Sequence, residues 1–261
     1  MKISIVMPVY NREDFLPEVL QSYFNQTDKD WELIIVDDCS IDSSFTICQD
    51  LAKKDDRIKC FRLKKNSGVA IARDYGNKKA NGDIIVVADS DDFAYPDRIK
   101  IIREYFEKNP DADIFYTNMD LNYIDDGIVK PRFFQPYVKD LLYNINFVPN
   151  ASSSYKKSAY VKVEGYDSEQ KIGEDYDLWL QFSDKNMKFG YDPRPTVKVT
   201  MHKKSIRSEE QDKHRSYIER VWKKHKSAGA DLTQVKQLAN KETYDFFSQP
   251  NKLELWFNIK N

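Results

Sequence analysis

Short apolar runs alternate with longer amphipathic stretches along the first 120 residues of the chain. Between residues 15 and 24, five apolar side chains recur at helical spacing and form one stripe: Phe15, Leu16, Val19, Leu20 and Tyr23. The same kind of pattern predicts strands at residues 3–7, 33–36, 58–63, 84–88 and 114–117, and helices at residues 15–24, 45–53, 69–79 and 99–108. Strands that alternate with helices of this length are typical of βαβ units. We therefore predict an α/β fold with a Rossmann-like, mainly parallel sheet flanked by helices.

The alternation lapses beyond residue 120. Asp125-Asp126-Gly127 predicts a turn, and the residues on either side of it indicate a hairpin. Residues 174–183 are predicted to be helical and residues 196–201 to form a strand. Charged helical regions follow at residues 209–226 and 232–247. We expect a main domain over residues 1–205 and a C-terminal helical extension over residues 206–261.

Composition narrows the class of protein. The 261 residues are 41% hydrophobic, which is ample for a packed core. A net charge of −1 gives no global attraction for nucleic acid, and no apolar run approaches the length of a membrane span. The N-terminal apolar run is too short for a signal peptide, and three cysteines in no metal-binding pattern indicate reduced thiols. These features favour a cytoplasmic protein that does not bind nucleic acid.

Three carboxylates, Asp89, Asp91 and Asp92, follow the apolar strand predicted at residues 84–88. Such a cluster at the end of a buried strand costs several kcal/mol unless a positive charge lies beside it. A hard divalent cation is a natural occupant, because Mg²⁺ and Mn²⁺ prefer oxygen ligands and often share them with a phosphate. The alternative is that Asp92 or Asp97 caps the next helix, which explains one carboxylate but not three.

Polar residues also close the first two predicted strands. Tyr10 follows the first strand, where its ring can face a base, although a plain strand–turn–helix junction accounts for this segment too. Asp38 follows the second strand and can accept a hydrogen bond from a uracil imide or a ribose hydroxyl, whereas Asp42 or Ser43 can simply cap the next helix. Ligands of parallel sheets bind beyond the carboxyl ends of the strands, so we expect these clusters to converge there.

Further candidate functional residues lie at the starts of two predicted helices. Gly68 precedes the helix predicted at residues 69–79 and permits close approach of a ligand, and Arg73 suits either a diphosphate or an ion pair in the core. Glu174 and Asp175 open the helix predicted at residues 174–183, where a favourable interaction with the helix dipole is the alternative to a chemical role.

In order and spacing, these segments resemble family 2 glycosyltransferases of the GT-A fold, inverting enzymes that use nucleotide-diphospho-sugars. The resemblance covers about residues 1–205 and rests on Pro8-Val9-Tyr10-Asn11, Asp37-Asp38-Cys39-Ser40, Asn66-Ser67-Gly68 through Ala72-Arg73, Asp89-Ser90-Asp91-Asp92 with Pro96-Asp97-Arg98, and Glu174-Asp175. It implies a nucleotide-sugar half over about residues 1–120 and an acceptor half over about residues 121–205.

The resemblance also implies roles for matching residues. The implied nucleotide-binding residues are Pro8, Tyr10, Asp38, Gly68, Arg73 and Asp89. Asp91 is the implied ligand of a Mn²⁺ or Mg²⁺ cofactor, and His202 is implied to reach the metal or the diphosphate, although a lone histidine near a strand end is often incidental. Asp175 is the implied catalytic base, and Glu174 and Trp179 are the implied acceptor contacts.

The chain departs from the family pattern in three places. Thr200 and Gln181 stand where arginines are frequent, and the QxxRW motif of processive synthases is missing. We therefore predict non-processive transfer of single sugars, from a UDP-sugar in preference to a GDP- or dTDP-sugar, to a glycan or a lipid-linked saccharide. Such a reaction belongs to the synthesis of cell-surface polysaccharide or glycoconjugates.

Other functions and a second role for the tail remain as alternatives. A sugar-nucleotide pyrophosphorylase needs a glycine-rich loop with a basic residue after the first strand, and here Arg12 is present but the glycines are not. A catalytically inactive nucleotide- or carbohydrate-binding module is the other alternative, and no GxGxxG supports a dehydrogenase. Residues 209–261 predict a solvated amphipathic helix, with peripheral membrane contact or homo-oligomer formation as alternatives.

Overall fold

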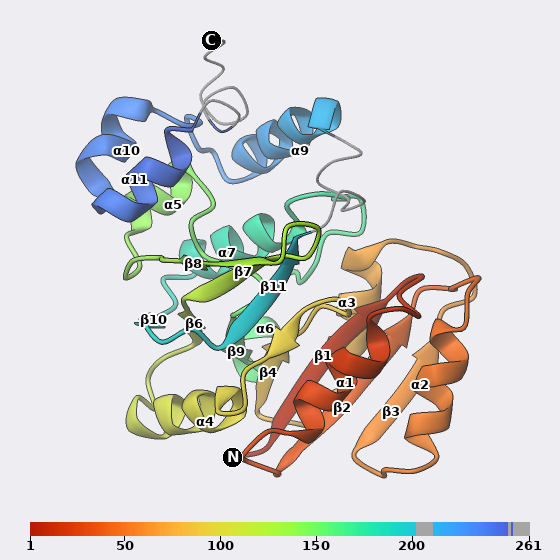
Figure 1. Cartoon of the computed structure of the whole chain (residues 1–261). Coiled ribbons are helices and arrows are strands. Elements are labelled where there is room, and N and C mark those ends of the chain that lie inside the picture. The colour runs from red at the N-terminus through yellow and green to blue at the C-terminus, as the bar shows by residue number, and fades with distance from the viewer. Residues whose placement is uncertain (202–210, 250–251, 253–261) are drawn as a thin grey trace.

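The computed structural model describes residues 1–201, 211–249 and 252. Through β7 the elements are β1 (Ile3–Val9), α1 (Leu16–Phe24), β2 (Trp31–Asp37), α2 (Ser44–Ala52), β3 (Ile58–Arg62), α3 (Val69–Lys79), β4 (Ile84–Val87), β5 (Phe93–Ala94), α4 (Arg98–Lys108), β6 (Ile114–Thr117) and β7 (Met119–Tyr123) (Figure 1). They are followed by β8 (Ile128–Arg132), α5 (Lys139–Asn144), β9 (Ser154–Lys156), α6 (Lys157–Tyr160), α7 (Glu174–Asp184), β10 (Phe189–Asp192), β11 (Val197–Met201), α9 (Gln211–Lys224), α10 (Leu232–Leu238) and α11 (Lys241–Phe247). The strands and helices predicted in the first 120 residues are all present, with ends shifted by no more than two residues.

Seven strands form the larger sheet, in the order β10-β6-β9-β4-β1-β2-β3. The neighbours among β1 to β4 are parallel, as are β6 and β10, whereas β9 runs antiparallel between β4 and β6. The predicted mainly parallel sheet is therefore confirmed. The sequence did not reveal β9, because three residues are too few to show a period and the strand is specified by pairing on both sides.

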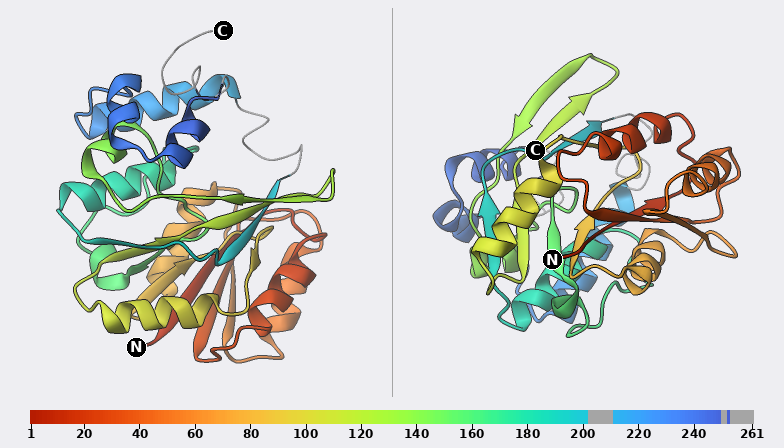
Figure 2. Two further views of the ribbon diagram at one scale, coloured as in Figure 1. Left: turned by 60° about the vertical axis from the view of Figure 1, so that its left-hand side comes forward. Right: turned by 90° about the horizontal axis from the view of Figure 1, so that it is seen from below.

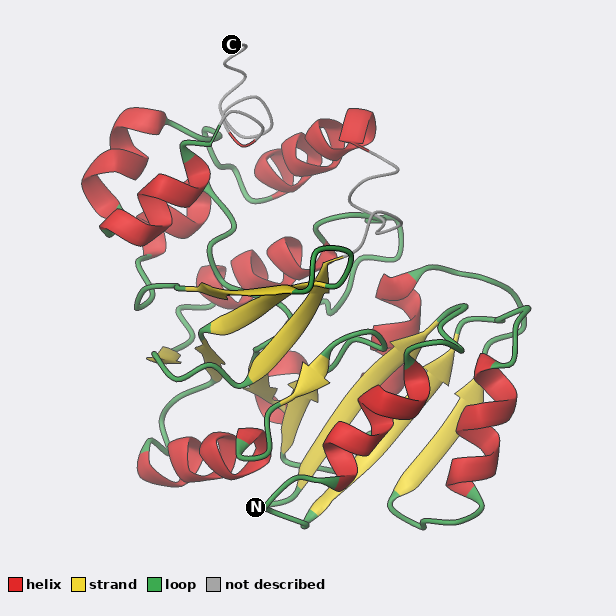
Figure 3. Ribbon diagram, in the orientation of Figure 1, coloured by secondary structure: helices red, strands yellow, loops and turns green. Residues whose placement is uncertain are grey.

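Each face of the larger sheet carries its own apolar core. Ile5 and Ile35 pack with residues of α1, α2 and α4 on one face, and Val6 and Val36 pack with residues of α3 and α7 on the other. Figures 2 and 3 show the helices on both sides of the sheet. A parallel sheet covered in this way is buried on both faces and leaves its strand ends as the accessible edge.

A smaller sheet, β5-β11-β7-β8, lies beside the larger one (Figure 1). The predicted hairpin is confirmed as the antiparallel pair β7–β8, with the Asp126 amide donating to the Tyr123 carbonyl at 3.1 Å. The strand predicted at residues 196–201 is β11, which pairs with both β7 and β5. Because β5 begins directly after Asp92, this pairing brings β11 close to the carboxylate cluster.

The helical tail differs from the prediction in one respect. Residues 232–247 were expected to form a single helix, but the helix ends before Asn240 and a new one begins there. The Asn240 side chain accepts a hydrogen bond from the Thr243 amide and caps α11, just as Asp231 caps α10. An N-cap in the middle of an apolar pattern therefore breaks the helix.

Helix α9 packs on the main domain, on the side of α7 (Figure 2). Ile218, Val221 and Trp222 are buried in the same core as α7, and the Trp222 indole donates to the Tyr176 hydroxyl at 3.1 Å. The amphipathic helix is thus present, and its apolar face is covered by the domain itself. Among the described helices, none is long and apolar enough to cross a bilayer. The predicted boundary at residues 205 and 206 lies outside the described residues.

One glycine of α3 tests how closely this helix packs on the sheet. A Cβ at Gly76 would lie 2.5 Å from Val6 Cγ1 in the buried face of β1. Alanine is preferred over glycine in a helix by about 1 kcal/mol, but overpacking typically costs about 1–3 kcal/mol. We expect Gly76→Ala to lower the free energy of unfolding, measured by urea denaturation. In a Val6→Ala background the same change should be neutral or stabilising, and equal effects in the two backgrounds would contradict the close contact.

Candidate active site at the carboxyl edge of the sheet

Three neighbouring strands carry the predicted polar segments to one edge. The Asp38 amide donates to the Val9 carbonyl at 2.8 Å, and the Ala88 amide donates to the Val6 carbonyl at 3.0 Å. These bonds continue the parallel pairing of β1 with β2 and β4 past the strand ends. The residues that follow the strands, Tyr10, Asp38 and Asp89, therefore lie along the same edge. The convergence of the clusters is confirmed.

Both oxygens of Asp38 accept hydrogen bonds from the loop before α3. The Ser67 amide lies 2.7 Å from Oδ1 and the Gly68 amide 2.8 Å from Oδ2. Gly68 adopts a φ of +93°, which side-chain-bearing residues rarely do. Burial raises the pKa of Asp38, and the two amide bonds oppose that rise. Asp38 thus fixes the Gly68 loop beside the strand ends, and Pro8 is buried within β1 opposite Val36.

The loops after β1 and β2 hold one another. The Asn11 amide donates to Ser40 Oγ at 3.0 Å, and the Asn11 side chain accepts from the Ile41 amide at 2.9 Å. Asn11 and Cys39 both have positive φ angles, of 50° and 63°, and such backbone strain concentrates at functional sites. Tyr10 remains 40% exposed beside this pair of loops, so its ring is accessible to a ligand.

The carboxylate cluster after β4 is crowded. Asp92 is buried, and its pKa is raised well above the usual value by burial and by the negative charges of Asp89 and Asp91. The Thr200 amide of β11 donates to Asp92 Oδ1 at 2.8 Å, and the Thr200 hydroxyl donates to the Asp91 carbonyl. Arg12 Nε lies 3.0 Å from Asp91 Oδ2. The segment is therefore anchored to β11 and carries an excess of negative charge.

This donor set fits a hard divalent cation. Oxygen atoms predominate, and burial, together with the negative charges of Asp89 and Asp91, raises the pKa of Asp92. Among residues 1–201, 211–249 and 252, no three His, Cys, Asp or Glu side chains form a metal-binding group by themselves. Mg²⁺ commonly takes only one or two carboxylates from a protein and completes its shell with water and substrate phosphates. The predicted ligand His202 lies outside the described residues.

Arg73 joins the carboxylate segment to the start of α7. Its guanidinium is buried, with Nη2 2.6 Å from Asp89 Oδ1 and Nη1 donating to Glu174 Oε1. Burial raises the pKa of Glu174 to about 7, with the charges of Asp175 and Asp89 adding to the rise and that of Arg73 opposing it. One guanidinium thus bridges two acidic segments that are far apart in the sequence.

Asp175 is the next residue of α7, and it is half-buried. Its Oδ2 accepts a hydrogen bond from the Asn146 amide group at 3.2 Å. Gly173, with φ of +74°, precedes the helix and turns the chain into it. The Arg73 bridge therefore holds the start of α7, and with it Asp175, near the edge of the sheet that carries Asp89 and Asp91.

Comparisons with known proteins identify the family of the chain. The profile of glycosyl transferase family 2 matches residues 4–163. This chain belongs to glycosyl transferase family 2. It is 32% identical over 187 residues to the UDP-Gal:α-D-GlcNAc-diphosphoundecaprenol β-1,3-galactosyltransferase of Escherichia coli, covering 69% of this chain and 67% of that protein.

Other family 2 relatives are longer. An uncharacterized glycosyltransferase of Rickettsia conorii is 33% identical over 198 residues, which cover 73% of this chain and 32% of that protein. A relative from Rickettsia felis is 34% identical over 196 residues, again 73% of this chain and 32% of that protein. The chain thus spans about a third of the length of these two relatives.

Solved structures share the GT-A fold. S. aureus TarS 1–349 in complex with UDP-GlcNAc gives a TM-score of 0.71 at 18% identity, covering 100% of this chain and 74% of that chain. The mannosyltransferase PcManGT from Pyrobaculum calidifontis, in complex with GDP-Man and Mn²⁺, gives a TM-score of 0.69 at 12% identity, covering 98% and 81%. The predicted fold is confirmed.

Three site predictions for this family 2 chain need correction. Trp179 was expected to contact the acceptor, but its side chain is fully buried and packs on Tyr155 and Phe182. Glu174, the other expected acceptor contact, is buried and paired with Arg73. The contacts of Arg73 are those of an ion pair in the core rather than of an exposed diphosphate ligand. Half of residues 174–183 are apolar, and they cover most of the helix surface, which was the signal that α7 is largely buried.

The sequence interpretation also missed residues that shape the family 2 site. In the sequence, Arg12 bears only on another enzyme class, and Thr200 is only a departure from the family pattern. Asn146 gave no local signal, because it lies in an irregular segment far from Asp175 in the sequence.

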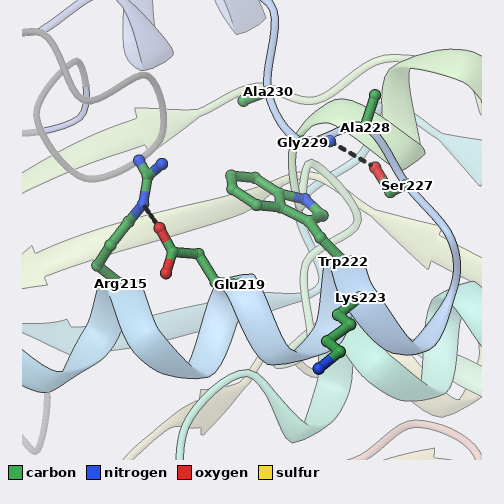
Figure 4. Close-up of a pocket in the computed structure, with 8 residues that line it drawn as sticks. All are labelled: Arg215, Glu219, Trp222, Lys223, Ser227, Ala228, Gly229 and Ala230. Atoms are coloured by element: carbon green, nitrogen blue, oxygen red, sulfur yellow. Dashed lines mark hydrogen bonds and ion pairs between the residues drawn. The ribbon is translucent and has the colours of Figure 1, made fainter.

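Two surface pockets lie elsewhere. One of about 350 Å³ is beside α9, where the Trp222 ring faces the segment from Ser227 to Ala230 and Arg215 pairs with Glu219 (Figure 4). Another of about 550 Å³ lies between α1 and the β7–β8 hairpin and includes Phe93 and Lys198. Neither includes Asp38, Asp91 or Asp175.

Removal of Arg73 tests the bridge. Breaking a buried ion pair by deleting one partner typically costs about 3–5 kcal/mol, and we expect that loss for Arg73→Met in chemical denaturation. Without the guanidinium, which opposes the rise, the pKa of Glu174 moves further above its unfolded value. A carboxyl group raised in this way destabilises the protein increasingly as pH rises, so the loss should be larger at about pH 8 than at about pH 5. An equal loss at both pH values would contradict the bridge, and Arg73→Lys should lose less.

Proposed function

We propose that this chain transfers a single sugar from a nucleotide-diphospho-sugar to a hydroxyl group of a glycan or a lipid-linked saccharide, with inversion at the anomeric carbon. The observation that carries the proposal is the Arg73 bridge, because it brings the segment of Asp89 and Asp91 and the segment of Asp175 to one edge of the sheet. A donor-binding group and a general base are thereby available to the same substrate pair.

The donor side is assigned to residues after β1, β2 and β4. Tyr10 offers an exposed ring for a base, and Asp38, with lone pairs besides those that bind the Gly68 loop, accepts from the base. UDP is favoured because the imide N–H of uracil can donate this hydrogen bond to Asp38. The E. coli relative is named for UDP-Gal and the TarS structure contains UDP-GlcNAc, whereas PcManGT contains GDP-Man, so GDP is the main competitor.

Asp91 is assigned to hold the cofactor, with His202 as a further proposed ligand, and Asp89 is assigned to contact the nucleotide-sugar. A bound Mn²⁺ or Mg²⁺ would neutralise negative charge that develops on the leaving diphosphate. Arg12 supplies the positive charge to Asp91 in this structure and also donates to the Asn11 carbonyl at 3.0 Å. It thus links the loop beside the nucleoside to the carboxylate that holds the cofactor.

Asp175 is the proposed general base. It takes the proton from the acceptor hydroxyl as the oxygen attacks the anomeric carbon on the face opposite to the diphosphate, and this single displacement inverts the configuration. The Asn146 amide orients the carboxylate, and Glu174 holds it in place through Arg73. Residues 121–205 are accordingly proposed as the acceptor half and residues 1–120 as the nucleotide-sugar half.

The comparison with the E. coli relative also supports a proposal for the acceptor and for the location of the enzyme. The E. coli relative is named for a diphosphoundecaprenol-linked saccharide, which supports a lipid-linked acceptor here. Such an acceptor would bring the enzyme to the cytoplasmic face of a membrane, in polysaccharide or glycoconjugate synthesis.

Asp175→Asn tests the base. Loss of a general base typically lowers kcat about 10²–10⁴-fold, and we expect that loss with donor affinity retained. Initial rates with a donor and acceptor panel give kcat, and thermal shift gives donor binding. The control is Asp140→Asn, which changes an exposed carboxylate at the start of α5. Full transferase rate in Asp175→Asn would remove Asp175 from this role.

Asp91→Asn tests the cofactor site. A donor present at 100 times its Kd stabilises the wild type by about 2.7 kcal/mol, and we expect this stabilisation only with Mn²⁺ or Mg²⁺. It should disappear in Asp91→Asn and on chelation, while Asp126→Asn, at the exposed hairpin turn, keeps it. A metal-independent melting shift, or one that survives Asp91→Asn, would contradict the assignment. Donor hydrolysis with Mn²⁺ separates an active enzyme from an inactive binding module.

A further inference from the structure

Asp177 is a buried carboxylate in α7, two residues after Asp175 and 1% exposed. Three donors reach it: His225 Nε2 at 2.9 Å, Lys224 Nζ at 3.0 Å and Gln181 Nε2 at 2.7 Å. Two of the three belong to cationic or ionisable side chains at the end of α9. A carboxylate this deeply buried is tolerated only with such partners. The tail therefore supplies the positive charge that α7 requires.

The His225 ring lies between two carboxylates of α7. Its Nδ1 is 2.6 Å from Asp184 Oδ2, its Nε2 is 2.9 Å from Asp177 Oδ1, and the side chain is only 3% exposed. A neutral imidazole has one N–H and can donate to only one of them, whereas the protonated ring donates to both. The geometry is thus that of an imidazolium.

Other charged groups adjoin this pair of carboxylates. Lys224 also lies 3.4 Å from Glu164, in the segment before α7, and the Tyr143 hydroxyl of α5 donates to Asp184. Burial by itself lowers the pKa of His225, but the hydrogen bonds and charges of Asp177 and Asp184 outweigh it, and the net change is upward. Burial raises the pKa of Asp177, but the hydrogen bonds to His225 and Lys224 lower it by more, so the net change is a decrease.

We propose that His225 and Lys224 are positioning residues, which hold α7 and thereby Asp175 in place through Asp177, and that the hold depends on a protonated His225. We call the four side chains Asp177, Asp184, Lys224 and His225 the α9 clamp. The inference rests on the proposed role of Asp175. Because Asp177 lies within one helical turn of Asp175, a shift of the clamped turn moves the base. Displacements of about 1 Å can cost up to about 10² in rate.

The pH dependence has a definite sign. A histidine whose folded pKa lies above its unfolded value contributes stability in full below the unfolded value, about 6.5, and loses it as pH rises through the folded value. The clamp is therefore closed near about pH 6 and opens on the alkaline side. His202 and His214 are the other histidines of the chain, so the titration must be assigned to one ring.

The experiment combines an NMR titration of the histidine rings with kinetics of the full chain from about pH 6 to about pH 9. Substitution of each histidine assigns the signals. We expect the His225 ring to titrate above its ordinary range and wild-type kcat to fall about 10-fold with the same midpoint, with KM for the donor unchanged. His225→Gln should show the low kcat throughout. His225→Lys, which stays charged, should keep the high kcat past that midpoint.

His214→Gln is the matched control, since His214 lies in α9 and is buried like His225. It should leave the midpoint where it is in the wild type. An alkaline decrease that persists unchanged in His225→Lys, or a His225 ring that titrates at or below about 6.5, would overturn the inference.

Failure of the proposed function would look different. If the wild type turns over no donor, the clamp is judged by amide hydrogen exchange of residues 173–177 at one pH near neutrality. Faster exchange in His225→Gln, restored in His225→Lys, supports the clamp, and identical exchange in the three proteins overturns it.

Discussion

A single buried guanidinium holds the candidate site together. Arg73 lies on α3, Asp89 follows β4 16 residues later, and Glu174 opens α7 101 residues later. Removing such a group from water costs several kcal/mol unless both carboxylates are present, so each segment is held by the other two. The bridge also fixes the position of Asp175, because Asp175 is the residue after Glu174. The proposed base is positioned by a contact of its neighbour and keeps its own carboxylate for the acceptor and Asn146.

The carboxyl edge of the sheet concentrates negative charge, and different carboxylates are neutralised in different ways. Backbone amides hold Asp38 and Asp92, which fixes the loops that carry them. Guanidinium groups hold Asp89, Asp91 and Glu174. Amide-bound carboxylates keep a fixed geometry, whereas the pair between Arg12 and Asp91 is partly exposed and can exchange partners at lower cost. This division is consistent with a structural role for Asp92 and a ligand-binding role for Asp91.

The C-terminal helices are energetically part of the domain on which they pack. Gln181 gives Asp177 an amide hydrogen bond without a charge. Lys224, at the end of α9, and His225, the next residue, bring positive charge to this carboxylate. The apolar face of α9, which in the sequence resembled a membrane or partner surface, is the face that makes this contact possible. A buried carboxylate of one segment is thus paired with cations from a segment more than 40 residues away.

The sequence by itself determined the order and kind of the elements, since the periodic apolar positions of α1 or β4 are local properties of the chain. It also determined that Tyr10, Asp38 and Asp89 lie along one edge of the sheet, because parallel strands end at a common edge. Four features depended on the tertiary structure. Arg73 forms an ion pair in the core, and Trp179 is buried on all sides. Strand β9 lies between β4 and β6, and the C-terminal tail packs against α7. These outcomes depend on which distant groups share a desolvated site, and the pairing energy of such groups is not encoded in any local pattern.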